Sequence, residues 1–196
     1  MPSAWEPTLA APDPATWQLK ENGGGYAHGQ ITHASALLFW LTDLRAASVS
    51  ALMSSAGSSV DLYNAAHVTF EEGALGTISG AATLPNDEKF QVDLRIFGSD
   101  GVVLIDMERE RAELLMHDGE RVNLEIPSGT GAYSCEVPPL RFVDLIQGLG
   151  TNDSPGWLAA RTVELIDAMH RSAAARGAVV QIEPSTANDE RALFST

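Results

Sequence analysis

Three consecutive glycines followed by a histidine form the segment of this chain best suited to chemistry. Residues 23–25 are all glycine, and His33 lies shortly after them at the start of an apolar run over 34–41. Glycine loses more conformational entropy on folding than any other residue, so a run of three indicates a sharp turn or a backbone that a ligand approaches closely. Because an imidazole exchanges a proton near neutral pH, we expect His33 to be a catalytic proton acceptor or donor. The alternative is a buried helix histidine bonded to backbone.

Three further side chains of this segment are candidate substrate contacts. Gln30 lies three residues before His33, so on a helix the two share a face and the amide could orient a substrate hydroxyl. His28 could reach the same cleft, although a loop histidine is often only solvated. Tyr26 could stack on a ligand ring, or could equally be a packing anchor between loop and helix.

The elements that must position these residues indicate an α+β fold. Apolar residues at helical spacing predict helices over 30–41, 140–149 and 155–176. Between the first two, a period of two and hairpin signals such as Asp118-Gly119 predict consecutive strands. The predicted strands cover 65–70, 75–82, 90–96, 102–105, 112–116 and 122–126, with a last strand over 178–182. We expect a mostly antiparallel, open-faced sheet with helices packed on one face.

One domain accounts for most of the chain. Of the 196 residues, 44% are hydrophobic, which is enough for a core. A proline-rich, linker-like lead-in over 1–22 precedes the domain at 23–183, and a polar tail follows at 184–196. The open sheet face, with His67 on it, would meet solvent, a ligand, a second domain or another copy of the chain.

The charge balance excludes several classes of partner. With 12 basic and 26 acidic residues, the net charge is −14, which repels nucleic acid and anionic lipid. No apolar run approaches the roughly 20 residues that span a bilayer. The single cysteine, Cys135, forms no internal disulfide, and no Cys/His cluster has zinc-ligand spacing. We expect a cytoplasmic protein without a metal.

Several short motifs, taken in order, resemble the C-terminal domain of the Gfo/Idh/MocA oxidoreductases. The glycine run is followed, ten residues after its first glycine, by His33 on a helix that ends in Phe39-Trp40-Leu41-Thr42. The other motifs lie at 60–61, 71–76, 96–101, 141–144 and 168–173, so the resemblance covers about residues 23–182. His33 matches the histidine of the family pattern, whereas Gly29 and Ala36 stand where the family often has aspartates.

The resemblance implies the substrate-binding and oligomerisation half of an NAD(P)-dependent oxidoreductase. Members of the family bind NAD or NADP in an N-terminal Rossmann domain, and the sheet domain supplies the substrate side of the cleft and commonly an oligomer interface. Hydride passes between the nicotinamide and a carbon that bears a hydroxyl, typically on a sugar or cyclitol. The resemblance therefore implies a Rossmann domain, a small polyhydroxylated substrate and further copies of the chain as partners.

A dinucleotide site is not expected within this sequence. Such a site needs a strand, a Gly-x-Gly-x-x-Gly turn and a helix within a unit of roughly 30 residues. Only 22 residues precede Gly23, and the glycines near 98–101 lie between two predicted strands. We expect this chain alone neither to bind NAD(P) tightly nor to turn over substrate. The alternatives are a non-catalytic ligand-binding or dimerisation module, and an unrelated α+β domain that binds an apolar ligand.

Overall fold

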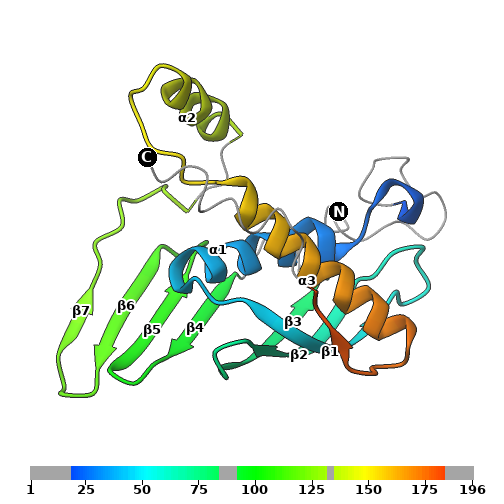
Figure 1. The fold of residues 1–196 in the computed structure, drawn as a ribbon. Helices are drawn as coiled ribbons and strands as arrows, with labels where there is room; N and C mark the ends of the chain where they lie inside the picture. Colours follow the sequence, from blue (N-terminus) through cyan, green and yellow to red (C-terminus); the bar gives the residue numbers. More distant parts are fainter. Residues whose placement is uncertain (1–18, 84–91, 132–134, 184–196) are drawn as a thin grey trace. The chain divides into compact units, whose positions relative to one another are not determined.

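The computed structural model describes residues 19–83, 92–131 and 135–183 (Figure 1). The chain divides into two compact units. The first unit comprises Met1–Asn86 and Pro155–Thr196, and the second unit comprises Asp87–Ser154. The domain predicted over 23–183 therefore spans both units, and the second unit is an insertion within the sequence of the first.

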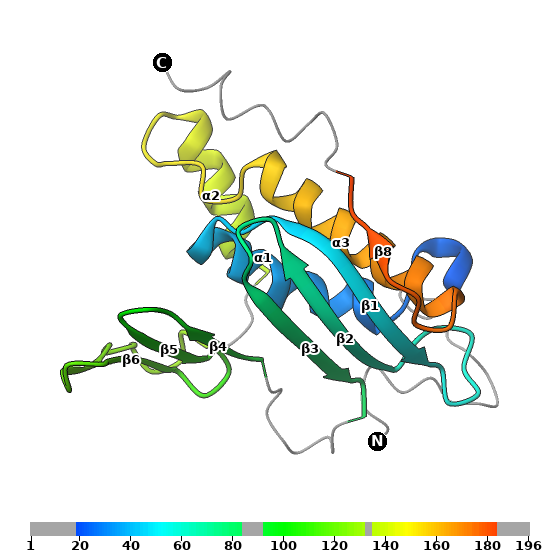
Figure 2. The ribbon, with the colours of Figure 1, turned by 60° about the horizontal axis from the view of Figure 1, so that its bottom comes forward.

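The first unit is an antiparallel sheet with helices on one face. Its sheet has the strand order β3-β2-β1-β8, and neighbouring strands pair antiparallel. The strands are β1 (Ala46–Ser54), β2 (Tyr63–Phe70), β3 (Leu75–Ala81) and β8 (Val180–Gln181). The helices are the 3-10 turn η2 (Lys20–Asn22), the π-helical turn η3 (Ala27–Ile31), α1 (Thr32–Thr42) and α3 (Gly156–Ala174). Figure 2 shows α1 and α3 on the same side of this sheet.

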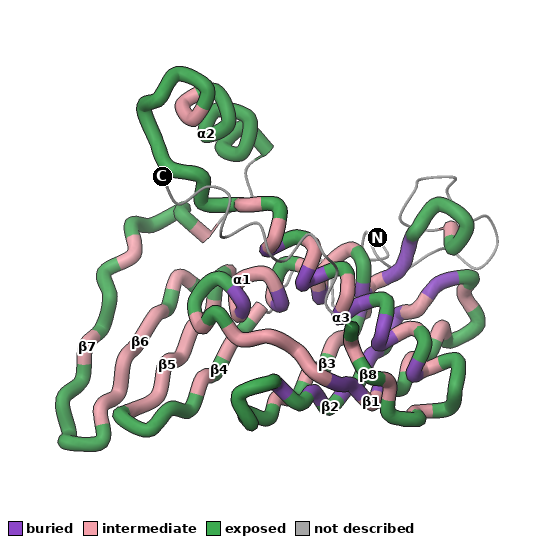
Figure 3. Tube along the Cα trace, viewed as in Figure 1, coloured by how far each residue is buried: buried purple, intermediate pink, exposed green. Residues whose placement is uncertain are grey.

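The core of the first unit lies between β2, β1 and the two helices. Along β2, every second residue from Asn64 to Phe70 is buried and the residues between them are exposed (Figure 3). Phe39 of α1 and Ile166 and Met169 of α3 are completely buried against this face. The opposite face, which includes His67, is open. The predicted arrangement of helices on one face of an antiparallel sheet is confirmed.

The second unit is also antiparallel, but none of its described residues is buried. Its sheet has the order β4-β5-β6-β7 and is followed by one helix. The elements are β4 (Asp93–Phe97), β5 (Gly101–Asp106), β6 (Arg111–Met116), β7 (Arg121–Asn123) and α2 (Val137–Ile146). The α+β class is thus confirmed, with the strands divided between two sheets.

Most predicted boundaries hold to within a turn. The helix predicted over 140–149 starts three residues earlier, because two prolines occupy its first turn, where a missing N–H costs nothing. The last strand contains two residues instead of five. Residues 1–18 of the predicted lead-in, residues 90–91 of one predicted strand and the tail 184–196 lie outside the described residues. Within the described part of the chain, no helix has both the length and the apolar character to cross a membrane.

Candidate functional site

The glycine run leads into a π-helical turn that carries His28 and Gln30. Gly23 and Gly25 have φ values of +74° and +125°, which explains the need for glycine at both positions. The N–H of Thr32 donates to the carbonyl of Ala27, five residues earlier, and the helix then continues as α1. Turns of this kind are rare and occur frequently at functional sites.

Asp61, from the loop between β1 and β2, holds the start of this turn in place. Its backbone carbonyl accepts the N–H of Tyr26 at 3.0 Å, and its Oδ2 accepts the N–H of Ala27 at 2.8 Å. The side chain of Asn64 donates to the same Oδ2 at 2.9 Å. A carboxylate is favoured here because the first N–H groups of a helix lack partners within it. A Cβ on Gly25 would collide with Oδ1 of Asp61, so the position of this carboxylate requires glycine at residue 25.

His28 pairs with His170, a residue near the end of α3. The two rings stack with centroids 4.9 Å apart and planes 17° from parallel, and Nδ1 of His28 lies 3.3 Å from Nε2 of His170. Burial lowers the pKa of His170, and the nearby His28 and Lys20 lower it further, against the opposing effects of Asp61 and Asp167. The lowered pKa favours the neutral form of His170, and a hydrogen bond between two imidazoles requires at least one of the two rings to be neutral.

Tyr26 is half-buried and acts as an anchor between the glycine segment and the sheet. Its ring lies directly over Gly80 of β3, where any Cβ would displace it. It also packs against the small apolar cluster of Val60, Leu62 and Ala82. Burial raises the pKa of the phenol, and a backbone hydrogen bond with Ala81 lowers it in part. Of the two roles predicted for Tyr26, packing is visible here, and substrate contact stays a prediction.

His33 and Gln30 lie on the remaining part of the segment. His33 is exposed in the first turn of α1, so the alternative of a buried histidine does not apply, and Gln30 is half-buried in η3. Both side chains lie within a short stretch that Asp61 and His170 hold from two other elements. Their roles in proton transfer and substrate contact remain predictions.

Sequence reasoning missed Asp61 and His170 as parts of this site. Both lie inside motifs that carry the family resemblance, at 60–61 and 168–173, and that is the signal which could have found them. On the helix predicted over 155–176, the spacing of Val163, Ile166 and Met169 predicts a buried stripe that includes His170. Val163 is instead exposed, and the ring of His170 contacts His28. The contact joins residues 142 positions apart, which no local pattern encodes.

The described residues do not form a dinucleotide-binding loop. The glycines at 23–25 follow a 3-10 turn, and Gly98 and Gly101 lie between the antiparallel strands β4 and β5. A pyrophosphate needs a strand, a glycine turn and a helix N-terminus in succession. In the same described ranges, no group of three or more His, Cys, Asp or Glu side chains could hold a metal ion. Cys135 is exposed.

Comparison with known proteins identifies relatives of this fold. The model of the GFO/IDH/MocA C-terminal domain matches residues 3–104. No curated protein sequence matches the chain. Among solved structures, it is similar to an NAD-binding protein from Listeria innocua, at 22% identity and a TM-score of 0.61, over 91% of this chain and 53% of that one.

Two further solved structures have names that include a reaction or pathway. A levoglucosan dehydrogenase in complex with NADH and L-sorbose aligns at 16% identity and a TM-score of 0.68, over 87% of this chain and 54% of that one. GenD2 from gentamicin A biosynthesis, in complex with NAD, aligns at 22% identity and a TM-score of 0.67, over 89% and 53%. The chain spans about half the length of each, and at these identities the likeness shows the fold.

Proposed function

The chain belongs to the GFO/IDH/MocA C-terminal domain family, and from this premise we propose that it is the substrate-binding domain of an NAD(P)-dependent oxidoreductase acting on a sugar, cyclitol or similar polyol. The observation that carries the proposal is the fold match to about half of a dehydrogenase whose structure includes NADH and L-sorbose. The other half of that dehydrogenase has no counterpart in this chain. A Rossmann domain, on the same or a separate chain, would take its place and bind the NAD or NADP that accepts hydride.

Within this proposal, His33 handles the proton of the substrate hydroxyl. The support is its exposed imidazole on the first turn of α1, at the position of the family's histidine. A positioned histidine contributes about 10²–10⁴-fold to such a step. Gln30 and His28 would contact neighbouring hydroxyls from the π-helical turn, and Tyr26 would contact the substrate with the edge of its ring. Gly29 stands at the position of an expected aspartate, so the turn supplies no carboxylate at that position.

The test uses the protein joined to its Rossmann domain. NAD(P)H formation should be measured with a panel of sugars and cyclitols, and His33→Ala should lower kcat by about 10²-fold or more. His117→Ala, which removes an exposed histidine from the second unit, should leave kcat unchanged. Circular dichroism checks that both variants fold. Absence of turnover with every polyol tested, with either NAD or NADP, would contradict the proposal.

Two companion measurements address the chain by itself. Titration of NADH fluorescence should detect no micromolar binding to this chain alone, because the described residues lack a dinucleotide loop. Light scattering should show a homo-oligomer, since we infer that copies associate through the open face of the first-unit sheet, where Leu52 and Leu75 are exposed. The second candidate function, a non-catalytic binding or dimerisation module, is favoured by Gly29 and predicts an oligomer without turnover.

A further inference from the structure

The hydrogen bond between His28 and His170 uses only one nitrogen of each ring. It joins Nδ1 of His28 to Nε2 of His170 at 3.3 Å, so Nε2 of His28 and Nδ1 of His170 remain. Among the described residues, neither of these two nitrogens has a hydrogen-bond partner. His28 is exposed on the π-helical turn, so its Nε2 can meet a ligand. Whether Nε2 donates or accepts there depends on where the protons of the pair lie.

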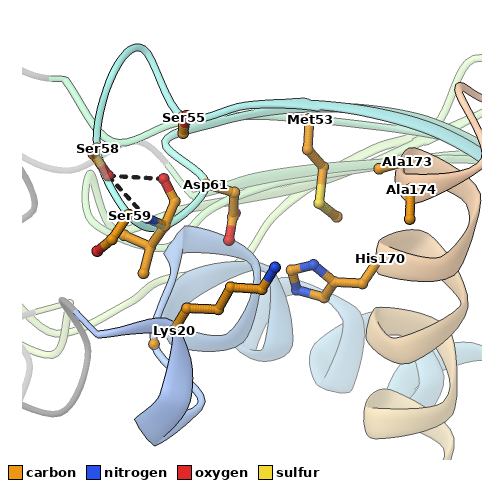
Figure 4. A pocket seen from close by; sticks show the side chains of 11 residues that line it. Lys20, Met53, Ser55, Ser58, Ser59, Asp61, His170, Ala173 and Ala174 are labelled. Atoms are coloured by element: carbon orange, nitrogen blue, oxygen red, sulfur yellow. Dashed lines mark hydrogen bonds between the residues drawn. The ribbon is translucent and has the colours of Figure 1, made fainter.

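Asp61 lies near the other end of the pair. Figure 4 shows its carboxylate and the His170 ring on the walls of one cavity, which has a volume of about 320 Å³. Oδ1 of Asp61 has no hydrogen bond within the described part of the chain, since the N–H of Ala27 and the side chain of Asn64 both bond to Oδ2. The cavity is large enough for water to bridge Oδ1 and Nδ1 of His170. The carboxylate can therefore act on the nitrogen of His170 that does not bond to His28.

The charges around His170 decide the direction of the hydrogen bond. Burial lowers its pKa, which favours the neutral ring. The charged groups that also shift this pKa are, from the strongest to the weakest, Asp61, His28, Asp167 and Lys20, and the two carboxylates raise it. A neutral imidazole has one N–H and one lone pair. Asp61 favours the N–H at Nδ1, and the exposed Lys20, which favours a lone pair there, acts more weakly. Nε2 of His170 then accepts the N–H at Nδ1 of His28.

We propose that His170 and Asp61 are positioning residues for His28: they hold its ring with the proton on Nδ1, so that the exposed Nε2 accepts a hydrogen bond from the ligand. A buried carboxylate fixes the tautomer of a catalytic histidine in the same way, and here a second imidazole stands between the two. The ligand must then present a donor at this point, and an ether oxygen there would leave Nε2 unpaired. That the ligand is the polyol of an oxidoreductase rests on the proposed function, whereas the proton position belongs to this chain alone.

The position of the proton can be measured on the chain alone. Long-range 1H–15N NMR spectra at pH 8 distinguish an imidazole nitrogen that carries a proton from one that does not, and His28→Gln identifies the signals of His28. We expect a protonated Nδ1 and a bare Nε2 in the unmodified chain. An isolated neutral histidine favours the opposite form, so this result requires a fixed partner. The proposal is overturned if His28 has its proton on Nε2.

Two substitutions of His170 separate the hydrogen bond from the ring contact. His170→Phe keeps an aromatic ring against His28 but removes the acceptor, so the proton should move to Nε2 of His28. His170→Gln supplies an amide oxygen in place of Nε2 and should keep the proton on Nδ1. His117→Phe, a control in the second unit, should leave the signals of His28 unchanged. Tryptophan fluorescence checks folding, and unchanged signals of His28 in a folded His170→Phe chain would also overturn the proposal.

The contribution of Asp61 is tested by Asp61→Asn. This substitution keeps an oxygen for the N–H of Ala27 and removes the charge. The fraction of His28 with its proton on Nε2 should rise severalfold, because nothing then favours the N–H at Nδ1 of His170. An unchanged fraction would overturn the role of Asp61.

The enzyme assembled with its Rossmann domain separates failure of this proposal from failure of the proposed function. For the polyol that it oxidises, His170→Phe should raise KM about tenfold and His170→Gln less than about threefold, as expected for the loss of one hydrogen bond. Among the mono-O-methyl ethers of that polyol, the unmodified enzyme should reject one that His170→Phe accepts, because a protonated Nε2 can donate to an ether oxygen.

The combined outcomes are distinct. If the enzyme oxidises a polyol and His170→Phe changes neither KM nor the preference among ethers, the positioning proposal is overturned and the function stands. If His28 has the expected proton position but the assembled enzyme transfers no hydride, the positioning proposal is supported and the proposed function fails.

Discussion

The two four-stranded sheets of this chain share an antiparallel pattern and differ in what covers them. In the first unit, α1 and α3 cover one face, and Phe39, Ile166 and Met169 have no exposed surface. In the second unit, no described residue is buried, and helix α2 has apolar side chains but no buried residue. Strand alternation alone therefore does not produce a core, because apolar residues need a second layer to pack against. In the first unit, helices α1 and α3 form this second layer.

The sequence provides a separate reporter for each unit. All four tryptophans lie in the residue ranges of the first unit, and the single cysteine, Cys135, lies exposed in the second. Tryptophan fluorescence therefore follows unfolding of the first unit, and a dye on Cys135 follows the second. A substitution in the first unit can therefore be compared with a matched substitution in the second within the same chain.

The largest effect is expected from a pair of phenylalanines. Phe39→Ala should lower the free energy of unfolding of the first unit by about 3–5 kcal/mol, because it leaves a cavity in a closed core. Phe97→Ala, at a side chain that is 75% exposed, should change the stability of the second unit by no more than about 0.5 kcal/mol. Urea titrations with the two reporters measure both values. Equal losses would mean that the second unit has a core of comparable quality.

Substitutions of two arginines compare a buried ion pair in the first unit with an exposed ion pair in the second. Arg161 of α3 is almost completely buried, pairs with Asp43 at 2.8 Å and lies over the ring of Trp157. Arg161→Met should destabilise the first unit by about 2–3 kcal/mol, because it breaks a charged hydrogen bond to the end of α1. Arg111→Met breaks an exposed ion pair with Glu113 and should produce no measurable shift in the dye-reported transition. A measurable shift there would contradict the contrast.

A pair of glycines addresses the site itself. Gly25→Ala forces a residue with φ +125° against Asp61 and should cost about 1–3 kcal/mol in the first unit. Gly119→Ala, in a second-unit turn with φ +98°, meets no atom within 4 Å and should cost only the backbone strain of about 1–2 kcal/mol. An equal loss for the two variants would argue against the close contact of Gly25 with Asp61.

The smallest effect concerns the pH dependence of stability. Burial lowers the pKa of His170 in the folded chain, so between that value and about 6.5 the unfolded chain binds more protons. The stability of the first unit should therefore fall as the pH drops below about 6.5. Urea midpoints at pH 7.5, 6.5 and 5.5 should show a steeper loss in the unmodified chain than in His170→Gln. His117→Gln, a matched change in the second unit, should leave the tryptophan-reported slope unaltered, and identical slopes in all three chains would contradict the prediction.

Most of the fold could be predicted from local patterns, because strand alternation, helical spacing and turn signals each depend on residues that are close together in the sequence. The hairpin at Gly119 was predicted from Asp118-Gly119, and Gly119 does adopt a positive φ. The alternation along β2 identified its buried face correctly. The division into two sheets was not predicted, since nothing in the alternation of 90–96 or 75–82 indicates which neighbour a strand will pair with.

The site was predicted less completely, because its geometry depends on distant contacts. The glycine run and the family pattern indicated the segment that carries His28, Gln30 and His33. The π-helical turn was not predicted, since it depends on Asp61 accepting the first N–H groups from 34 residues away. A helical pattern predicts which side chains share a face, but it does not predict which other element packs against that face. The pairing of His28 with His170 was missed for this reason.

The interruption of the first unit has a consequence for the order of folding during synthesis. Its sheet strands β1 to β3 leave the ribosome before the whole second unit, and its covering helix α3 follows only afterwards. Ser172 Oγ accepts the N–H of Ala51 across 121 residues, and Ser50 Oγ donates to the carbonyl of Gly177 across 127. At about 5–20 residues per second, the sheet waits several seconds with the part of its apolar face that α3 covers still exposed. A chaperone that binds nascent chains would find this face accessible in that interval and closed once α3 has docked.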